Sequence, residues 1–252
     1  MWLLLGLLLG VGAIVAANQL EGGSLLQLVN LPAALIVFGG TLGAVMVQTP
    51  PAILRRTGQL LSLSQRTPLS HEQGIQQLIH WCITAHRKGL VALEQEASSV
   101  EDRFVRNGLQ LLADGKPAEA VRATLEVELI TREQRDYQAA RVLESMGGYA
   151  PTMGIIGAVL GLIQVMVRLD QPSQLGSGIA TAFVATIYGI GVANLLLLPL
   201  AAKLRQMIDS RSLYHEMMME GLLMIADGQG PKSVQLKLQG YLDTSDAAPT
   251  PS

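Results

Sequence analysis

Charged residues are scarce in this chain and absent from long parts of it. Only 15% of its 252 residues are Asp, Glu, Lys or Arg, whereas 49% are hydrophobic and the mean hydropathy is +0.35. A soluble domain of this size carries more polar surface, so the composition predicts an integral protein of the lipid bilayer. The single cysteine, Cys82, excludes an internal disulfide framework and is compatible with a reducing cytoplasm.

The chain also lacks the patterns of several functional classes. Its basic residues alternate with acidic ones and the net charge is −2, so we expect no nucleic-acid partner. His80, Cys82 and His86 do not have the spacing of zinc ligands on one helix, so we expect neither a metal nor a cofactor. No nucleophile has a base nearby, and Gly154–Gly161 is no phosphate loop because it falls in an apolar segment, so we expect no enzyme.

The position of the basic residues predicts the membrane topology. Seventeen of the eighteen Lys and Arg residues lie in two stretches, Pro50–Gly147 and Ala201–Ser252. By the positive-inside rule both stretches are cytoplasmic, so four apolar segments form two membrane hairpins and both termini are cytoplasmic. The outer loops, about Asn18–Asn30 and Arg168–Gly176, are short. The sequence therefore predicts a multi-pass protein of the bacterial inner membrane.

This all-α fold divides into four parts. Residues 1–49 form the first transmembrane hairpin, 50–147 a helical cytoplasmic domain, 148–202 the second hairpin, and 203–252 a cytoplasmic helix with a disordered tail after Gly240. The expected spans are Trp2–Ala17, Pro32–Gln48, Tyr149–Val167 and Gly178–Ala202. A signal peptide cleaved after Ala17 is disfavoured, because the first basic residue is Arg55 and a signal needs a positive start.

Turn and cap residues predict the helices of the cytoplasmic domain. Ser70 and Gln73 form a capping box that begins a helix, and Gly89 interrupts that helix. The further helices expected are Leu90–Glu96, Val100–Ala113, one from Pro117 with Val121, Leu125 and Leu129 on one side, and one from about Thr131 into the third span.

Small residues recur at four-residue spacing in every span. They are Gly6 and Gly10, Gly39 and Gly43, Gly157 and Gly161, then Ala185, Gly189 and Ala193. Such stripes let helices approach closely in lipid. In the first two spans we interpret them as holding the chain's own bundle together. The last two spans also carry polar side chains that should face protein or water, namely Thr152, Gln164, Thr181, Thr186, Tyr188 and Asn194.

Two prolines bracket the second hairpin. Pro151 lies near the cytoplasmic start of the third span, where a first helical turn would tolerate it, and Pro199 lies inside Leu195–Leu200, where no such position exists. Each removes a backbone donor and can kink its helix. Kinks at one membrane depth predict a hinge.

Five motifs, spread over nearly the whole chain, resemble the MotA/PomA flagellar stator family within the MotA/TolQ/ExbB ion-channel group. They are Leu20–Gly23, Gly39–Ala44, Arg87–Glu94, Ala150–Gly154 and Thr186–Gly189. The resemblance implies a pentamer around a pair of MotB-like helices, with the third and fourth spans lining the ion path. It also implies coupling of ion flow to flagellar rotation, with Arg87, Lys88, Glu94 and Glu96 meeting the rotor protein FliG and with Pro151 and Pro199 as coupling prolines.

The spans themselves contain no Asp, Glu, Lys, Arg or His. An ion carrier normally needs an ionisable or well-coordinated site in the membrane, so a partner must supply the acid. This requirement agrees with the single-span, MotB-like subunit that the resemblance implies, which carries one membrane Asp.

The ion is predicted from the residues of the ion path, for which we select Pro151, Thr152, Ala158, Ala185, Thr186 and Pro199. Sodium-driven members of that family resemble one another in having a Thr after the Gly of the third span and a pair of Thr residues in the fourth span. At the corresponding positions this chain has Ala158 in the third span and Ala185 with Thr186 in the fourth, so only one of the three Thr residues is present. Protons are therefore favoured over sodium.

The main alternative function is that of an ExbB- or TolQ-type channel, which powers an outer-membrane process. Those proteins resemble a three-span layout, and the two full hairpins expected here argue against this alternative. A transporter or scaffold would show inverted repeats or intramembrane charges.

Overall fold

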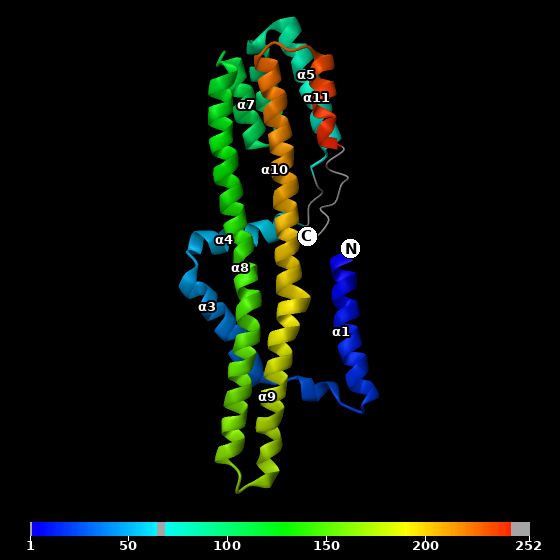
Figure 1. Ribbon diagram of the computed structural model, residues 1–252, viewed down its shortest axis with the longest axis vertical. Coiled ribbons are helices and arrows are strands. Elements are labelled where there is room, and N and C mark those ends of the chain that lie inside the picture. The colour runs from blue at the N-terminus through cyan, green and yellow to red at the C-terminus, as the bar shows by residue number, and fades with distance from the viewer. Residues whose placement is uncertain (1, 65–68, 243–252) are drawn as a thin grey trace. The chain divides into compact units, whose positions relative to one another are not determined.

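The computed structural model describes residues 2–64 and 69–242, and every regular element in those ranges is a helix (Figure 1). These residues divide into two compact units, one formed by residues 1–64 and 138–205 and the other by 65–137 and 206–252. Two borders between the units fall inside continuous helices, Ala118–Val167 and Leu198–Ala226. The units therefore do not end at residues 49, 147 and 202, where the membrane borders are expected. Those borders stay predictions.

The first unit contains the apolar helices. Its elements are α1 (Trp2–Leu20), η1 (Leu25–Leu28), α2 (Leu31–Ala34), η2 (Leu35–Gly39), α3 (Gly40–Gln48), α4 (Pro51–Leu63), the second part of α8 (Ala118–Val167), α9 (Pro172–Val192), η4 (Ala193–Leu197) and the start of α10 (Leu198–Ala226). Within the described residues, three helices are long and apolar enough to cross a membrane, namely those of Leu31–Gln48, Ala118–Val167 and Leu175–Ala226, and Leu5–Leu20 is a shorter apolar helix.

Large apolar side chains cover the outside of this unit. Leu8 is 73% exposed, Val47 90% and Phe183 68%. Such surface is unusual on a soluble protein and is expected where lipid or protein neighbours cover it. The four predicted apolar segments are thus all helical, although the length criterion alone selects three of them.

The second unit has a conventional hydrophobic core. It is built from α5 (His71–Lys88), η3 (Leu90–Ala92), α6 (Leu93–Ser99), α7 (Arg103–Ala113), the first part of α8, the end of α10, and α11 (Pro231–Leu238). Fully buried residues from these helices pack together, including Leu78, Phe104, Leu109, Leu125, Met217 and Leu222. The predicted stripe of Val121, Leu125 and Leu129 on α8 lies in this core.

Several predicted helix borders can be compared with this structure. The hydroxyl of Ser70 accepts a hydrogen bond from the backbone N–H of Gln73 at 3.3 Å, which confirms the predicted start of α5. Gly89 ends that helix with φ +83°, a conformation that suits glycine. The predicted start at Val100 was wrong, because Asp102 caps the Phe104 N–H at 2.9 Å and α7 begins at Arg103.

Two other expectations are corrected. The separate helices predicted from Pro117 and from about Thr131 are one helix, α8, which runs unbroken to Val167. In the tail predicted after Gly240, Tyr241 and Leu242 still pack against the core, and the rest of that tail, from residue 243, lies outside the described residues.

Candidate functional site: the apolar hairpin and its cytoplasmic helices

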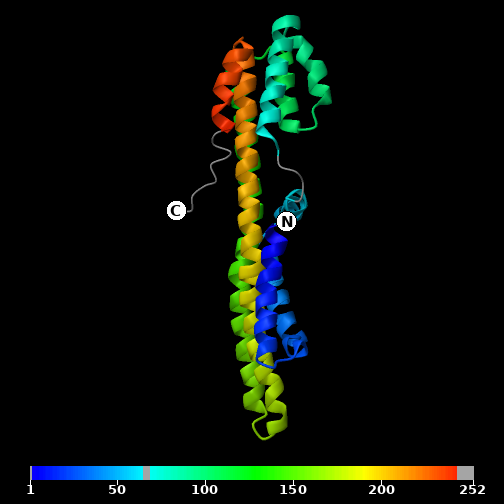
Figure 2. The ribbon, with the colours of Figure 1, turned by 90° about the vertical axis from the view of Figure 1, so that its right-hand side faces the viewer.

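The centre of the first unit is the antiparallel pair formed by α8 and α9 (Figures 1 and 2). A methyl group placed on Gly189 would lie 2.5 Å from the carbonyl oxygen of Ala150, and one on Gly154 would lie 2.8 Å from that of Ala185. Both distances are shorter than real carbon contacts, so the two backbones touch at these positions. The small residues therefore set the spacing of the hairpin.

The small-residue stripes can be compared with the packing of the described helices. Gly157 and Gly161 of α8 contact Ala185 and Gly178 of α9, so the stripes of spans three and four hold the chain's own hairpin together. In the first two spans, a methyl group placed on Gly10 would lie against Leu195, whereas one placed on Gly6, Gly39 or Gly43 would meet no other described atom within 4 Å. For these three glycines the role inside the chain's own bundle stays a prediction.

The residues selected for the ion path lie at several levels of exposure. Ala185 is fully buried against Gly157, and its neighbour Thr186 is partly buried with its hydroxyl donating to the Ala182 carbonyl at 3.2 Å. Ala158 is half-buried, whereas Thr152 is exposed and donates to the Tyr149 carbonyl at 2.7 Å. The structure thus brings Ala158, Ala185 and Thr186 to one level of the hairpin, while Thr152 lies nearer Tyr149.

Both prolines lie inside long helices. Pro151 is interior to α8, so the first-turn position that would make it unremarkable is excluded. Pro199 is exposed and follows η4. This element is a π-helical turn, in which backbone hydrogen bonds join residues five apart instead of four. A π turn accommodates a break in the hydrogen-bond ladder. The kink-forming residue of the fourth span therefore has a second irregularity directly before it.

A polar anchor holds the start of the second span against α9. Asn30 caps α2 by accepting from the Ala33 N–H at 3.0 Å, and its amide donates to the Thr181 hydroxyl at 2.9 Å. The Tyr188 hydroxyl donates to the Leu28 carbonyl at 2.5 Å and accepts from the Asn30 N–H at 3.3 Å. Of the polar residues singled out in the spans, Thr181 and Tyr188 therefore face protein, as predicted.

An open cavity of about 710 Å³ lies beside this anchor. Its lining mixes apolar side chains with a few polar ones, namely Asn30, Gln164, Arg168, Ser177 and Thr181. It contains no carboxylate, so this cavity alone offers no group that binds and releases a proton near neutral pH.

The charges selected for rotor contact lie on two consecutive helices of the second unit. Arg87 and Lys88 are exposed in the last turn of α5, and Glu94 is exposed in the first turn of α6. Glu96 is half-buried and lies 3.4 Å from the His80 imidazole. These positions also suit the helix dipoles, with cations at a C-terminus and anions at an N-terminus.

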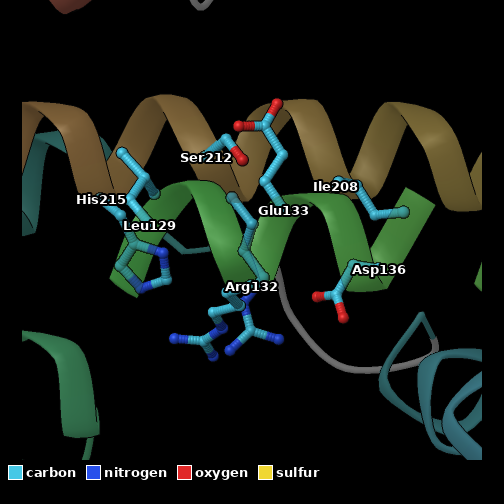
Figure 3. Close-up of a pocket in the computed structure, with 8 residues that line it drawn as sticks. Leu129, Arg132, Glu133, Asp136, Ile208, Ser212 and His215 are labelled. Carbon is cyan, nitrogen blue, oxygen red and sulfur yellow. The ribbon is translucent and has the colours of Figure 1, made fainter. Parts of the chain in front are cut away.

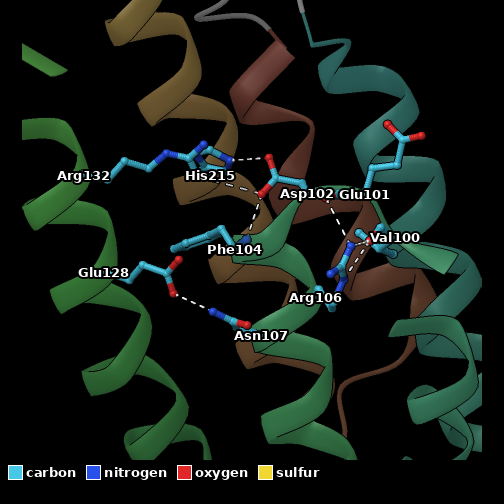
Figure 4. A network of polar contacts seen from close by, with 9 residues as sticks. All are labelled: Val100, Glu101, Asp102, Phe104, Arg106, Asn107, Glu128, Arg132 and His215. Carbon is cyan, nitrogen blue, oxygen red and sulfur yellow. Dashed lines mark hydrogen bonds and ion pairs between the residues drawn. The ribbon is translucent and has the colours of Figure 1, made fainter. Parts of the chain in front are cut away.

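A buried ion network that the sequence did not indicate joins three helices of the second unit (Figure 4). His215 of α10 is 2% exposed and lies 3.0 Å from the Asp102 carboxylate, which also approaches Arg132 of α8 at 4.0 Å. Burial alone would raise the pKa of Asp102, but the hydrogen bond and charge of His215, the Phe104 N–H and Arg132 outweigh it and hold that pKa far below its ordinary value. Asp102 therefore stays ionised at physiological pH.

A water-sized cavity of about 10 Å³ lies between α8 and α10 near this network (Figure 3). Its polar lining includes the buried carboxyl of Asp136, together with Glu133 and Arg132. Glu216 directly follows His215 on α10, and burial together with the nearby charge of Glu133 raises its pKa. In the described part of the chain no cluster of three His, Cys, Asp or Glu side chains could hold a metal ion.

Comparison with known proteins identifies the class of this fold. Residues 96–217 match the model of the MotA/TolQ/ExbB proton channel family. Motility protein A of Bacillus subtilis is 35% identical over 245 residues, which cover 96% of this chain and 91% of that protein. Motility protein A of Helicobacter pylori strain 26695 is 32% identical, covering 95% and 93%, and chemotaxis protein PomA of Vibrio alginolyticus is 30% identical, covering 97% and 96%.

Solved structures agree with the sequence comparison. The Campylobacter jejuni MotAB structure matches 99% of this chain and 98% of its own chain, with a TM-score of 0.89 and 31% identity. The flagellar MotAB stator complex of Bacillus subtilis matches 97% and 99%, with a TM-score of 0.86 and 34% identity. The fold is thus that of the helical membrane subunits of energy-transducing channels. Within that class, the chain belongs to the MotA/PomA flagellar stator family.

Proposed function

We propose that this chain is the ion-conducting stator subunit of a flagellar motor and couples proton flow to torque. The observation that carries the proposal is the full-length match to chains of MotAB complexes, at TM-scores of 0.89 and 0.86. A strain without stators that produces this chain with its MotB-like partner should swim. Assembled complexes that leave the strain immotile would contradict the proposal.

The proposed placement is a multi-pass protein of the inner membrane with four spans and cytoplasmic termini. It is supported by the four apolar helices and by the basic residues on one side of them. Reporter fusions at Gly22 and Gln174 should report the periplasm, and one at Gly115 the cytoplasm. A periplasmic Gly115 would exclude this topology.

The proposed assembly is a pentamer around two helices of a MotB-like subunit that carries the membrane Asp. Two observations support a partner of this chemistry. The spans hold no Asp, Glu, Lys, Arg or His, and apolar faces of α8 and α9 remain uncovered, with Ile155, Ile163 and Phe183 all more than half exposed. An acid supplied by the partner would complete a site that this chain lacks.

Protons are proposed as the ion because Ala158 and Ala185 lack hydroxyl ligands and the Thr186 hydroxyl is bonded to its own helix. Motility driven by this stator should follow the proton gradient and ignore external sodium. If swimming stops when sodium is replaced by potassium, sodium is the ion.

Contact with the rotor protein FliG is proposed for Arg87, Lys88, Glu94 and Glu96. The first three are exposed and have no ion-pair partner among the described residues, so their charges are available to steer a transient contact. Arg87→Glu with Lys88→Glu should impair rotation without lowering membrane assembly, because exposed charges contribute little to folding. A matched reversal of the exposed Lys116 and Lys232 should leave rotation intact, and equal loss in both variants would exclude a specific contact.

The alternative of an ExbB- or TolQ-type channel is less well supported. The family model covers both groups, but the full-length relatives reported above are motility proteins. Rescue of an outer-membrane process, without rescue of swimming, would favour that alternative.

A further inference from the structure

Basic residues gather at one end of the apolar unit. Five of the six Lys and Arg residues in residues 1–64 and 138–205 follow the second span or flank the cytoplasmic ends of the third and fourth spans. We call them the basic collar, and they are Arg55, Arg56, Arg141, Lys203 and Arg205. The collar residues lie in the segments 50–64, 138–147 and 201–205, in which Glu144 is the single carboxylate. These segments therefore have a surplus of four positive charges.

Hydrogen bonds bring the collar residues to one level. The Thr57 hydroxyl of α4 donates to the Ala139 carbonyl of α8 at 2.9 Å, and Arg205 of α10 forms a double contact with Glu144 of α8 at 2.5 and 2.6 Å. Ala139 and Glu144 are about 8 Å apart along the helix axis, at roughly 1.5 Å per residue. Arg141 lies between them.

The helix α4 presents its basic residues beside the spans. Two residues separate it from the end of α3, and it lies crosswise to α8 (Figures 1 and 2). Its buried face contains Thr57 and Leu60, whereas Arg55 is exposed on the opposite side and Arg56 is half-buried on the flank. A helix with one apolar and one basic side next to a span is typical of the membrane interface.

The positive charges of the collar are largely uncompensated within the protein. Arg55, Arg141 and Lys203 are exposed and have no ion-pair or hydrogen-bond partner for their side chains among the described residues, while Arg205 is paired with Glu144. The Tyr149 hydroxyl donates to the Gln48 amide oxygen at 2.6 Å two turns nearer the span, a position typical of aromatic residues at the membrane surface. These three cations are therefore available to an anion at the depth of the lipid headgroups.

We propose that the basic collar binds the phosphate headgroups of anionic phospholipids in the cytoplasmic leaflet. The proposal rests on the membrane placement proposed above. Arginine suits this ligand because its planar guanidinium donates two parallel hydrogen bonds to phosphate oxygens. The bound headgroups would fix α4 against the membrane and compensate the collar without a protein carboxylate.

The test uses the full chain purified with its partner subunit in a mild detergent. Phosphatidylglycerol and the zwitterionic phosphatidylethanolamine are titrated separately, and bound lipid is counted by native mass spectrometry. The variant Arg55→Gln/Arg141→Gln/Lys203→Gln removes the three unpartnered charges. The control Arg87→Gln/Lys88→Gln/Lys116→Gln removes three exposed charges from the other unit.

We expect the collar variant to bind phosphatidylglycerol at least fivefold more weakly, since one basic residue near an anionic surface contributes about a factor of five. The control variant should bind like the wild type. Unchanged binding in the collar variant, an equal loss in the control, or equal binding of phosphatidylethanolamine by the wild type would overturn the proposal.

Two further comparisons keep the test decisive. If the triple variant fails to assemble with the partner, Arg55→Gln and Arg87→Gln are compared singly by the same criterion. Swimming is scored separately, because lipid binding by the purified complex does not depend on torque. A motile stator that shows no lipid preference would refute only the collar, and an immotile one that keeps it would refute only the motor function.

Discussion

At the scale of single residues, glycine contacts determine how closely α8 and α9 approach each other. Gly154 and Gly189 lie where the backbones of α8 and α9 meet, and any side chain at either position would collide with a carbonyl oxygen. Backbone atoms cannot rotate away as a flexible side chain can. The hairpin therefore tolerates no added methyl group there, although alanine has the better helix propensity.

The substitution Gly189→Ala should lower the melting temperature of the purified protein by several degrees, because overpacking costs about 1–3 kcal/mol. Gly191 is the matched control, since it lies on the same helix with no atom within 4 Å of an added methyl group. Gly191→Ala should be neutral or slightly stabilising. Equal melting temperatures for the two variants would show that the contact does not limit the hairpin.

Asp102 has a structural part in the second unit, because it caps α7 and pairs with the buried His215. Asp102→Asn should destabilise this unit by about 2 kcal/mol, the range for a hydrogen bond to a charged group. The neighbouring Glu101 is exposed, so Glu101→Gln is a control expected to have little effect. Thermal unfolding followed by circular dichroism measures both.

The pH dependence of this effect has a defined sign. The native pKa of Asp102 lies below its unfolded value, so its contribution is complete above the unfolded pKa of about 4 and is lost as the pH falls through the native pKa. The difference between wild type and Asp102→Asn should therefore be complete at about pH 5 and shrink below about pH 4. A difference that is unchanged between pH 5 and 2 would contradict this assignment.

At the scale of helices, irregular turns mark the places where the long helices can bend. The π turns η2 and η4 lie within the apolar unit, and Pro199 is the second residue after η4. Their carbonyls are less regularly bonded than those of an ideal helix. The predicted hinge at Pro199 thus has a local structural basis, while Pro151 removes a backbone donor inside the continuous helix α8.

Pro199→Ala should leave assembly unchanged but reduce swimming speed, because it restores a backbone donor next to the π turn. Pro172 offers the control, since it occupies the first turn of α9, where a missing donor has little consequence. Pro172→Ala should swim normally. If Pro199→Ala cells also swim at wild-type speed, the hinge has no part in coupling.

Local sequence signals predicted the elements better than their borders. The Ser70 cap and the Gly89 stop follow from adjacent residues, as does the apolar stripe of α8. The sequence placed the start of α7 at Val100, because it did not reveal that Asp102 is the cap. The same carboxylate pairs with His215, which is 113 positions away, so no local pattern could indicate it. Neither π turn has a proline inside it that would have signalled an irregular helix.

At the scale of the whole molecule, charge divides the protein as clearly as packing does. Residues 1–64 and 138–205 carry six basic and three acidic side chains, whereas the other unit carries twelve basic and seventeen acidic ones. The apolar unit thus combines uncharged spans with a basic end, and the exposed charges proposed for rotor contact belong to the acidic unit. Such a protein has the parts for torque but lacks the acid that a proton path needs.

Proton flux into liposomes tests this account most directly. This chain is reconstituted alone, with its partner, and with a partner whose membrane Asp is replaced by Asn, and flux is followed with a pH-sensitive dye under an imposed potential. The account predicts flux only for the complex with the intact carboxylate, because the spans of this chain contain no Asp, Glu, Lys, Arg or His. Robust flux through this chain alone, or flux that survives the loss of the partner's carboxylate, would contradict it.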